Sequence, residues 1–494
     1  MRVLIVSNVE VSLLNGDGNA QPLRLYRYLF LFFLLSLPLV NPIVHGDGVG
    51  YYAYARAPLI QHNLHFEEDW QHANLNFAQS RTDAGGQLLP EEYTETGYVS
   101  NLFTVGPAIL WMPFLVIAHI LVLLARMFGA HTLADGFSFP YILAMAVGTV
   151  VYGFLGLLLS FSLAKKYLGE WFAFFATVAV WFGSSLPVYM YFNPAWSHAH
   201  SAFAVALFLW YWDKTRGARS NGQWLLLGLL AGLLVDVYFP NGVFLLLPLL
   251  ESLRGYAVRW KSPEQKIAPL LIGNFLFASL FLLTLLPTFI TRRIIFGGFL
   301  RFGSYSHLTW DWSAPHWRDV LFSPDHGLFS WTPLLLLALY GLLIVPRAAR
   351  ELAVYLGAAS LAFYYVISSY PYWDGLSSFG NRFFISLTPV FVFGVAAFLN
   401  RFANIFSNLR VARAASAVLI GCFIVWNLGM IYQWGTHLIP VRGPISFREA
   451  AYNQFHVVPG QISSRLRSYF LRRGDFMQQI EQKDLEQLKQ RPQP

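Results

Sequence analysis

The sequence predicts an all-helical protein that crosses a membrane many times. Of its 494 residues 56% are hydrophobic and 12% are charged, whereas a soluble domain has roughly 25% charged residues. The mean hydropathy is +0.46, and the 16 Trp, 25 Tyr and 44 Phe are typical of aromatic belts at two membrane interfaces. We therefore predict an all-α polytopic membrane fold.

Composition also argues against several classes of protein. The single cysteine, Cys422, rules out an intramolecular disulfide and argues against a thiolate metal cluster. The net charge of +8 comes without a basic stripe interleaved with aromatics, so we expect no nucleic-acid partner. The chain has no Walker-type loop, no H-E-x-x-H and no G-x-S-x-G, and no inner loop is long enough for a nucleotide-binding domain. An activated group would therefore arrive attached to a lipid.

The apolar runs give the predicted membrane spans, since crossing the hydrocarbon takes roughly 20 apolar residues. The first run, about 25 to 40, is too long for a signal-peptide core and has no A-x-A site after it, so we interpret it as a signal anchor. The eleven predicted spans are 25–43, 139–163, 171–190, 197–213, 223–237, 241–254, 268–290, 329–346, 351–369, 383–400 and 413–434. The fifth and sixth are short and could form a re-entrant pair around the break DVYFPNG, residues 236–242.

The apolar stretch 101–127 decides the orientation. If it lies on or dips into the outer face, the positive loops all fall on the cytoplasmic side, as the orientation rule requires. The loop cations are Arg24, Arg27, Lys165, Lys166, Lys214, Arg216, Arg219, Arg254, Arg259, Lys261, Lys266, Arg347, Arg350, Arg401, Arg410 and Arg413. We expect the N-terminus inside, the C-terminus outside and the Lys165/Lys166 pair to be a topology signal alone.

This map divides the chain into three parts. Residues 1–24 would be cytoplasmic, 25–435 would form the membrane domain, and 436–494 would be an extracytoplasmic tail. Two long outer loops, 44–138 and 291–327, lie within the domain, and the first carries the acid-rich run 67–69 and interfacial helices. We expect the end of the tail, EQKDLEQLKQRPQP, to be a short exposed helix that frays into disorder.

Asp47 is the first candidate for chemistry. It lies between Gly46 and Gly48 in NPIVHGDGVGYYAYA, just after the first span, and Tyr51 and Tyr52 follow. A carboxylate at a membrane boundary is costly without a role or partner, and flanking glycines permit a sharp turn and close approach of another molecule. Asp47 is either a turn or helix-cap residue or a catalytic base facing a lipid-borne substrate.

Two histidines mark the start of the fourth span, in NPAWSHAHS. His198 and His200 are two residues apart, so on a regular helix they point in nearly opposite directions and cannot share a metal ion. They would converge only if this turn were irregular; otherwise they form hydrogen bonds at the interface.

Arginines on the outer side are the third signal. Arg292, Arg293 and Arg301 lie where the orientation rule disfavours arginine, and a guanidinium gives bidentate, permanently charged recognition of phosphate. The alternative is that Arg292 and Arg293 snorkel to lipid headgroups.

Single charged residues lie beside aromatics and glycines in two further outer segments, SPDHGLFSWTP and YPYWDGLSSFGNRFF. These charges are Asp325, His326, Asp374 and Arg382. Asp374 and Arg382 could pair with each other, and the aromatics would suit sugar rings.

Four features together resemble membrane glycosyltransferases of the GT-C fold. They are the acid after the first span, the outer loop with an apolar helix ending in a G-P-A-x-L-W-M-P-like segment (Gly106 to Pro113), the polar start of the fourth span, and the G-x-R-F-F motif (Gly380 to Phe384). The layout over about residues 20–435 is similar to the bacterial branch of protein O-mannosyltransferases and lipid A aminoarabinose transferases.

The resemblance implies a polyprenyl-phosphate sugar donor that enters from the bilayer and an inverting displacement on the outer face of a bacterial inner membrane. Asp47 matches the base. Arg292, Arg293, Arg301 and Arg382 would hold the donor phosphate, and Tyr51, Tyr52, His198, His200 and Asp374 would bind substrate. Family members often carry a second acid where this chain has His198 and His200, so the chemistry on the acceptor side stays open.

The remaining alternatives concern substrate and class. The acceptor is a glycan, lipid or protein, no cofactor is required by the pattern, and a divalent cation stays open. A transporter or flippase of lipid-linked saccharide, or a non-catalytic membrane subunit, would share the aromatics and outer cations, although transporters place polar residues at mid-membrane and show repeated halves.

Overall fold

The computed structural model describes residues 21–489 apart from 80, 84, 263 and 302–308. Most of the expected cytoplasmic N-terminus, part of the second outer loop and the last residues of the tail lie outside the described residues. Within them the chain is helical, with two isolated β-bridges and no strand, which confirms the all-helical fold class.

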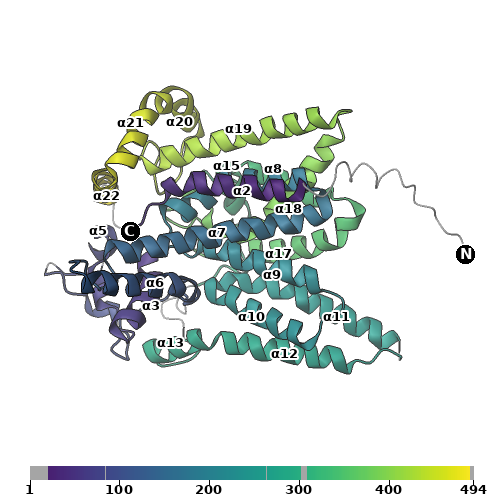
Figure 1. Ribbon diagram of the computed structural model, residues 1–494, viewed down its shortest axis with the longest axis horizontal. Coiled ribbons are helices and arrows are strands. Elements are labelled where there is room, and N and C mark those ends of the chain that lie inside the picture. The colour runs from purple at the N-terminus through teal and green to yellow at the C-terminus, as the bar shows by residue number, and fades with distance from the viewer. Residues whose placement is uncertain (1–20, 80, 84, 263, 302–308, 490–494) are drawn as a thin grey trace, which may run out of the picture.

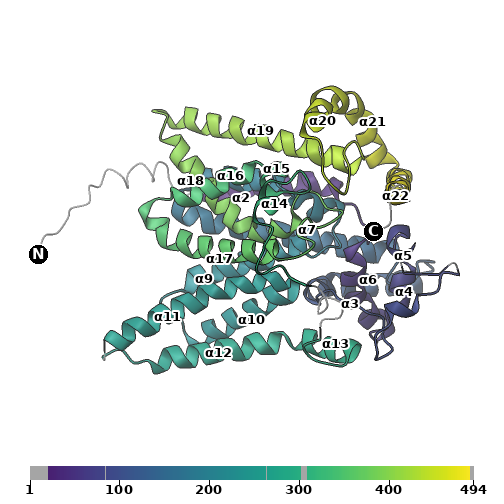
Figure 2. The ribbon, with the colours of Figure 1, turned by 180° about the vertical axis from the view of Figure 1, so that it is seen from behind.

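Long helices run side by side and form one bundle (Figures 1 and 2). They are α2 (Gln21–Ser36), α7 (Phe139–Leu168), α8 (Glu170–Phe182), α9 (His198–Thr215), α10 (Asn221–Val237), α11 (Leu246–Lys261), α12 (Ala268–Thr284), α13 (Leu286–Phe296), α16 (Leu334–Leu343), α17 (Arg350–Ser368), α18 (Thr388–Ala403) and α19 (Leu409–Gly435). Short turns extend or join them: η1 (Leu37–Leu39), η4 (Val188–Phe192), η5 (Phe239–Leu245), α15 (Leu328–Trp331), η7 (Arg347–Ala349) and η8 (Arg382–Leu387).

The other helices belong to outer loops and to the tail. The first outer loop holds α3 (Asp47–Arg56), η2 (Ala57–Gln61), α4 (Glu67–Gln71), α5 (Leu75–Gln79), η3 (Pro90–Glu92) and α6 (Gly106–Met127), and the second holds α14 (Trp317–Phe322). The tail holds α20 (Phe447–Tyr452), η9 (Asn453–Val457), α21 (Val458–Leu471) and α22 (Arg473–Lys489).

Five of the described helices are long and apolar enough to cross a membrane. They are α6, α7, α17 with η7, α18 with η8, and α19; α12 and α13, bent by 41°, make a sixth if they count as one span. This identifies a multi-pass membrane protein. The other predicted spans coincide with shorter or interrupted helices, and the predicted break DVYFPNG is present, since α10 ends at Val237 and η5 begins at Phe239. The count of eleven spans and the orientation stay predictions.

Small residues let the bundle helices pack closely. A Cβ placed on Gly341 of α16 would lie 1.8 Å from the carbonyl oxygen of Gly394 on α18. Such close backbone contact is how helices associate inside membranes, where the hydrophobic effect gives little help.

The apolar stretch 101–127 differs in detail from the prediction. The GPAILWMP segment begins α6 instead of ending it, because Pro107 lies in the first turn, where its missing N–H costs no hydrogen bond. Helix α6 then runs antiparallel to the first part of α7: Trp111 Nε1 donates to Thr149 Oγ1 at 2.8 Å, and His119 Nδ1 lies 2.7 Å from the Tyr141 hydroxyl.

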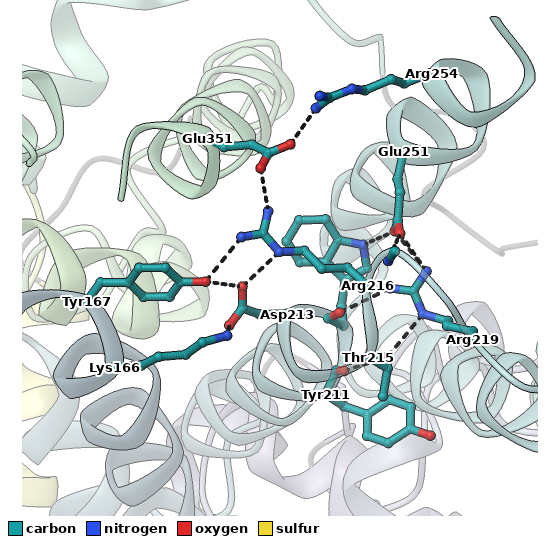
Figure 3. Close-up of polar contacts among 12 residues, drawn as sticks. Lys166, Tyr167, Tyr211, Asp213, Thr215, Arg216, Arg219, Glu251, Arg254 and Glu351 are labelled. Atoms are coloured by element: carbon teal, nitrogen blue, oxygen red, sulfur yellow. Dashed lines mark hydrogen bonds and ion pairs between the residues drawn. The ribbon is translucent and has the colours of Figure 1, made fainter. Parts of the chain in front are cut away.

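Several loop cations meet at the end of the bundle far from Asp47 (Figure 3). The buried carboxylate of Asp213 accepts hydrogen bonds from Lys166 Nζ and Tyr167 at 2.7 Å each, and Arg216 Nε lies 3.2 Å away. Glu251 is the second carboxylate of this charge network. It accepts hydrogen bonds from Arg219 Nη1 and from Trp212 Nε1, each at 2.8 Å.

Glu351 joins these helices to α17, since Arg216 Nη1 lies 3.4 Å from its carboxylate and Arg254 also pairs with it. Four of the predicted loop cations therefore lie close together at one end of the bundle: Lys166, Arg216, Arg219 and Arg254. Lys166 is more than a topology signal, because its ammonium is part of a charge network that ties α7 to α9.

The end of the tail, predicted as a short exposed helix, is helical up to Lys489 as part of the longer helix α22, and residues 490–494 lie outside the described residues. Three helices, α20 to α22, fold back onto the end of the bundle that carries α3 to α6 (Figure 1). Gln433 of α19 is fully buried, and its Nε2 donates to the carbonyl of Ala450 at 3.1 Å, which fixes the start of the tail.

Candidate functional site

A cavity of about 850 Å³ lies where the first outer loop meets the tail. It is lined by parts of the segment 39–47, the end of α8 with η4, the loop 375–382, the end of α19, α21 and α22. Most of the lining is apolar, and Asp47 and Arg382 are both part of it. A concave apolar site with a few converging polar groups is typical of a ligand site.

Asp47 is the first residue of α3, and the two glycines beside it allow this position. Gly46 has φ +58°, a conformation that favours glycine, and its backbone N–H donates to Asn74 Oδ1 at 3.0 Å. A Cβ on Gly48 would lie 2.5 Å from the Cβ of Ala195. The glycines therefore permit a turn and close packing within the protein, rather than the approach of another molecule.

Asp47 forms an ion pair with Arg382. Nη2 of Arg382 donates to Oδ2 of Asp47 at 2.8 Å, with 10% of the arginine side chain exposed and 37% of the aspartate. The start of a helix also favours a negative charge at Asp47. The expected pairing of Arg382 with Asp374 was wrong.

The guanidinium of Arg382 has further partners. Its Cζ lies 4.2 Å from the ring centroid of Trp196, a distance at which a cation is attracted to the ring face. Trp196 in turn donates from Nε1 to the carbonyl of His45 at 2.9 Å. Among the described residues, Nε of Arg382 is buried without a hydrogen-bond partner. Buried charged donors without a hydrogen-bond partner are rare in folded proteins, so this N–H marks a place where a ligand could bind.

The other three predicted arginines do not line the cavity. Arg292 is buried, and its Nη1 and Nη2 donate to the carbonyls of Asn101 (2.9 Å), Leu102 (2.8 Å) and Phe103 (2.8 Å), so it holds the chain just before α6. Arg293 donates to the carbonyl of Gly297, and Arg301 lies 3.6 Å from the exposed Glu95. The structure brings only Arg382 of the four to Asp47.

The two predicted tyrosines lie inside the protein. Tyr52 donates to the carbonyl of Gly136 at 2.7 Å and is buried. The Tyr51 hydroxyl accepts a hydrogen bond from Ser197 Oγ at 3.0 Å, and its ring packs on Phe103 at 4.8 Å. Neither is among the residues that line the cavity.

The histidines diverge, as a regular helix requires, because α9 begins at His198. His198 packs edge-on to Tyr189 with ring centroids 5.0 Å apart, and His200 packs edge-on to Trp111 at the same distance. Both are buried, outside the cavity lining. They do not form a joint metal site.

Asp374 lies beside the cavity, in a cluster with Asp325 and His326. Ligand atoms of the three lie within 4.8 Å of one another. Nδ1 of the fully buried His326 donates to the carbonyl of Asp374 at 3.0 Å, and burial lowers the pKa of His326 to about 4. This imidazole nitrogen therefore already carries a proton and a partner, whereas Nε2 of the same ring is buried without a hydrogen-bond partner among the described residues.

Sequence reasoning missed the contribution of the tail to the cavity. On α22, Met477, Ile480, Glu481 and Asp484 all line it. Their spacing of three, one and three residues places them on one helix face, a signal that was present in the sequence.

No family model and no curated protein matches this chain. Among solved structures, the chain is similar to ArnT from Cupriavidus metallidurans in the apo state, with a TM-score of 0.44 and 13% sequence identity over 83% of this chain and 70% of that one.

Proposed function

We propose that the protein transfers a sugar from a polyprenyl-phosphate donor to an acceptor on the extracytoplasmic face of a bacterial inner membrane. The observation that carries this proposal is the Asp47–Arg382 pair on the wall of a large apolar cavity, with one guanidinium N–H left unpartnered among the described residues. The pair supplies a base and a phosphate-binding cation at one point.

The apolar side of the cavity supports a lipid-linked donor. Leu428 of α19 and Ile462 and Leu466 of α21 line the cavity, and they are 42%, 38% and 42% exposed. A polyprenyl chain can lie along such residues while its phosphate reaches Arg382. The donor would thus enter sideways, between α19 and α21.

The reaction follows from the roles of the two charges. The acceptor oxygen forms a bond to the anomeric carbon while the bond from that carbon to the phosphate oxygen breaks, and its electron pair leaves with the phosphate. Arg382 holds the phosphate as its charge grows, usually the largest catalytic contribution in a site poor in water. Asp47 takes the proton of the acceptor hydroxyl, from about 3 Å.

The ion pair links donor binding to base activation. Before the donor binds, Asp47 Oδ2 accepts a hydrogen bond from Arg382. A donor phosphate that attracts the guanidinium releases this oxygen, which can then accept a proton. The donor would therefore bind before the acceptor reacts.

The test is Asp47→Asn with a labelled polyprenyl-phosphate sugar. A general base contributes about 100- to 10,000-fold, so the variant should lose release of polyprenyl phosphate by that factor and keep its fold. Glu95→Gln is the matched control, because Glu95 is an exposed acid of the same outer loop, 92% exposed.

Two outcomes would count against the proposal. If Asp47→Asn released polyprenyl phosphate at nearly the wild-type rate, Asp47 would not be the general base. Wild-type protein that binds the labelled donor without releasing phosphate would favour a transporter or a non-catalytic subunit.

A further inference from the structure

The last tail helix forms part of the cavity wall beside the segment that leads to Asp47, since Asn41 Nδ2 donates to Met477 Sδ at 3.6 Å. Helix α22 presents Met477, Ile480, Glu481 and Asp484 to the cavity, while its other faces carry polar residues such as Gln482 and Glu486, which are exposed. Without α22 the cavity would be open to outer water on this side. The helix therefore separates the proposed reaction centre from solvent.

The tail is held firmly at its beginning and at the junction of α21 with α22. Gln454 Nε2 donates to the carbonyl of Val425 at 3.1 Å, which adds to the Gln433 contact. At the junction the Tyr469 hydroxyl donates to the carbonyl of Leu39 at 2.6 Å, and Arg473 Nη2 donates to the carbonyl of Pro38 at 2.8 Å. These bonds fix α21 and the first turn of α22 to the end of the first predicted span.

Beyond the junction α22 is held by two polar latches. Glu481 Oε1 accepts a hydrogen bond from the backbone N–H of Leu75 at 2.9 Å. Asp484 Oδ1 lies 2.7 Å from Nε2 of His437, at the end of α19. A weaker contact, from Asn41 Nδ2 to Met477 Sδ at 3.6 Å, lies beside them. The side chain of His437 is 3% exposed and that of Asp484 is 23% exposed. Gly474 follows the junction with open space around it. A few residues at the end of an element are enough for a hinge motion.

We infer that α22 is a gate that swings from the junction at Arg473 and admits the acceptor to the cavity. In the closed position, seen here, the latches hold the side of α22 that carries Met477 and Ile480 over the site and exclude water, which would otherwise compete with the acceptor for the donor sugar. The inference rests on the proposed function for what passes the gate. The movement itself is tested without any sugar.

The cavity size gives the gate a consequence for the acceptor. With α22 closed, about 850 Å³ holds a sugar phosphate and a small acceptor group. The reacting part of the acceptor should therefore be slender, because α22 must close over it for water to be excluded.

The first experiment measures gate opening by cysteine labelling. In a Cys422→Ser background, Ile43→Cys places one thiol on the cavity wall, and a charged methanethiosulfonate reports its access to water. Adding Glu481→Ala and Asp484→Ala removes both latches, and we expect labelling to speed up by at least about tenfold, because the loss of even one charged hydrogen bond has an effect of that size. The matched control is Glu486→Ala, an exposed acid of the same helix.

The second experiment closes the gate. His437→Cys with Asp484→Cys, joined by a short bis-methanethiosulfonate, should lower transfer to acceptor about tenfold, and reduction of the link should restore it. Binding of labelled donor should change little, because the donor enters beside α19.

If the Glu481→Ala/Asp484→Ala variant and Glu486→Ala were labelled at the same rate, the inference that α22 is a gate would be refuted. If the double alanine variant fails to fold, His437→Ala breaks one latch from the opposite side and gives the same test. The labelling experiment needs no sugar transfer, so its result is valid even if the protein shows no transferase activity. Failure of the gate and failure of the proposed function can therefore be distinguished.

Discussion

The substitution Arg382→Lys tests whether Arg382 binds the donor phosphate or only balances the charge of Asp47. Lysine keeps the positive charge, and its ammonium can still reach the Asp47 carboxylate that Arg382 contacts at 2.8 Å. It cannot reproduce the planar fork that lies 4.2 Å over Trp196 and directs several N–H groups at once. The variant therefore keeps the ion pair and loses the bidentate grip on a phosphate.

The size of the effect follows from one charged hydrogen bond. Losing such a bond costs about 1.5–3 kcal/mol, which is about 10- to 150-fold in kcat when the bond forms in the transition state. The stability cost is smaller, because an ion pair in which 37% of the aspartate side chain is exposed contributes about 1 kcal/mol. Arg382→Gln, which removes the charge, should lose about 100- to 1,000-fold in kcat.

The assay is release of polyprenyl phosphate at saturating donor, alongside thermal unfolding in detergent. Arg293→Lys is the control, since this exposed arginine contacts the carbonyl of Gly297 outside the cavity and should keep its rate. Wild-type kcat in Arg382→Lys would refute the phosphate role. A fall in kcat that only matches the loss of folded protein would refute it as well.

Two further predictions concern stability. Because the pKa of buried His326 is lowered to about 4, the unfolded chain takes up a proton below pH 6.5 that the folded chain does not, and stability should fall by about 2 kcal/mol on going from pH 7 to pH 5. His326→Phe should shrink this difference in thermal unfolding, and an equal pH dependence in both proteins would contradict the reasoning. Glu251→Ala leaves Arg219, whose side chain is 1% exposed, without its carboxylate and should cost about 3 kcal/mol with unchanged transfer per folded molecule. Exposed Glu264→Ala is its control, and equal unfolding temperatures of the two variants would show that the network is not stabilising.

Apolar runs and loop charges in the sequence predict much of the fold. The break after Val237 and the meeting of Lys166, Arg216 and Arg219 at one end follow from local patterns, because length, hydropathy and charge are local properties. The pairing of Asp47 with Arg382, in contrast, cannot be predicted from local sequence patterns. The residues are 335 positions apart, and no spacing rule connects them.

Two errors have physical causes. Arg292 has the residue type and position expected of a phosphate ligand, but three backbone carbonyls before α6 use its N–H groups, and such partners cannot be read from the sequence around it. The polar composition at the end of the tail leads us to expect a short exposed helix there, without contacts to the bundle. The tail folds because one face of α22 covers the cavity and because Tyr469 and Arg473 bond to carbonyls at the end of η1.

Helix α9 shows why the chemistry is expected at one end of the bundle. Its first turn packs near the Asp47 segment, where Ser197 donates to Tyr51, and its last turn carries Asp213 in the charge network. At 1.5 Å per residue these ends are roughly 22 Å apart. A transport path would need polar groups that remain accessible between them, but between the ends Ser201 is buried and bonded to Asn241 and Ser386 at 2.9 and 2.7 Å. A satisfied buried network holds helices together and offers nothing to a passing solute, so the cluster of Ser201, Asn241 and Ser386 gives no support for a transport path along α9.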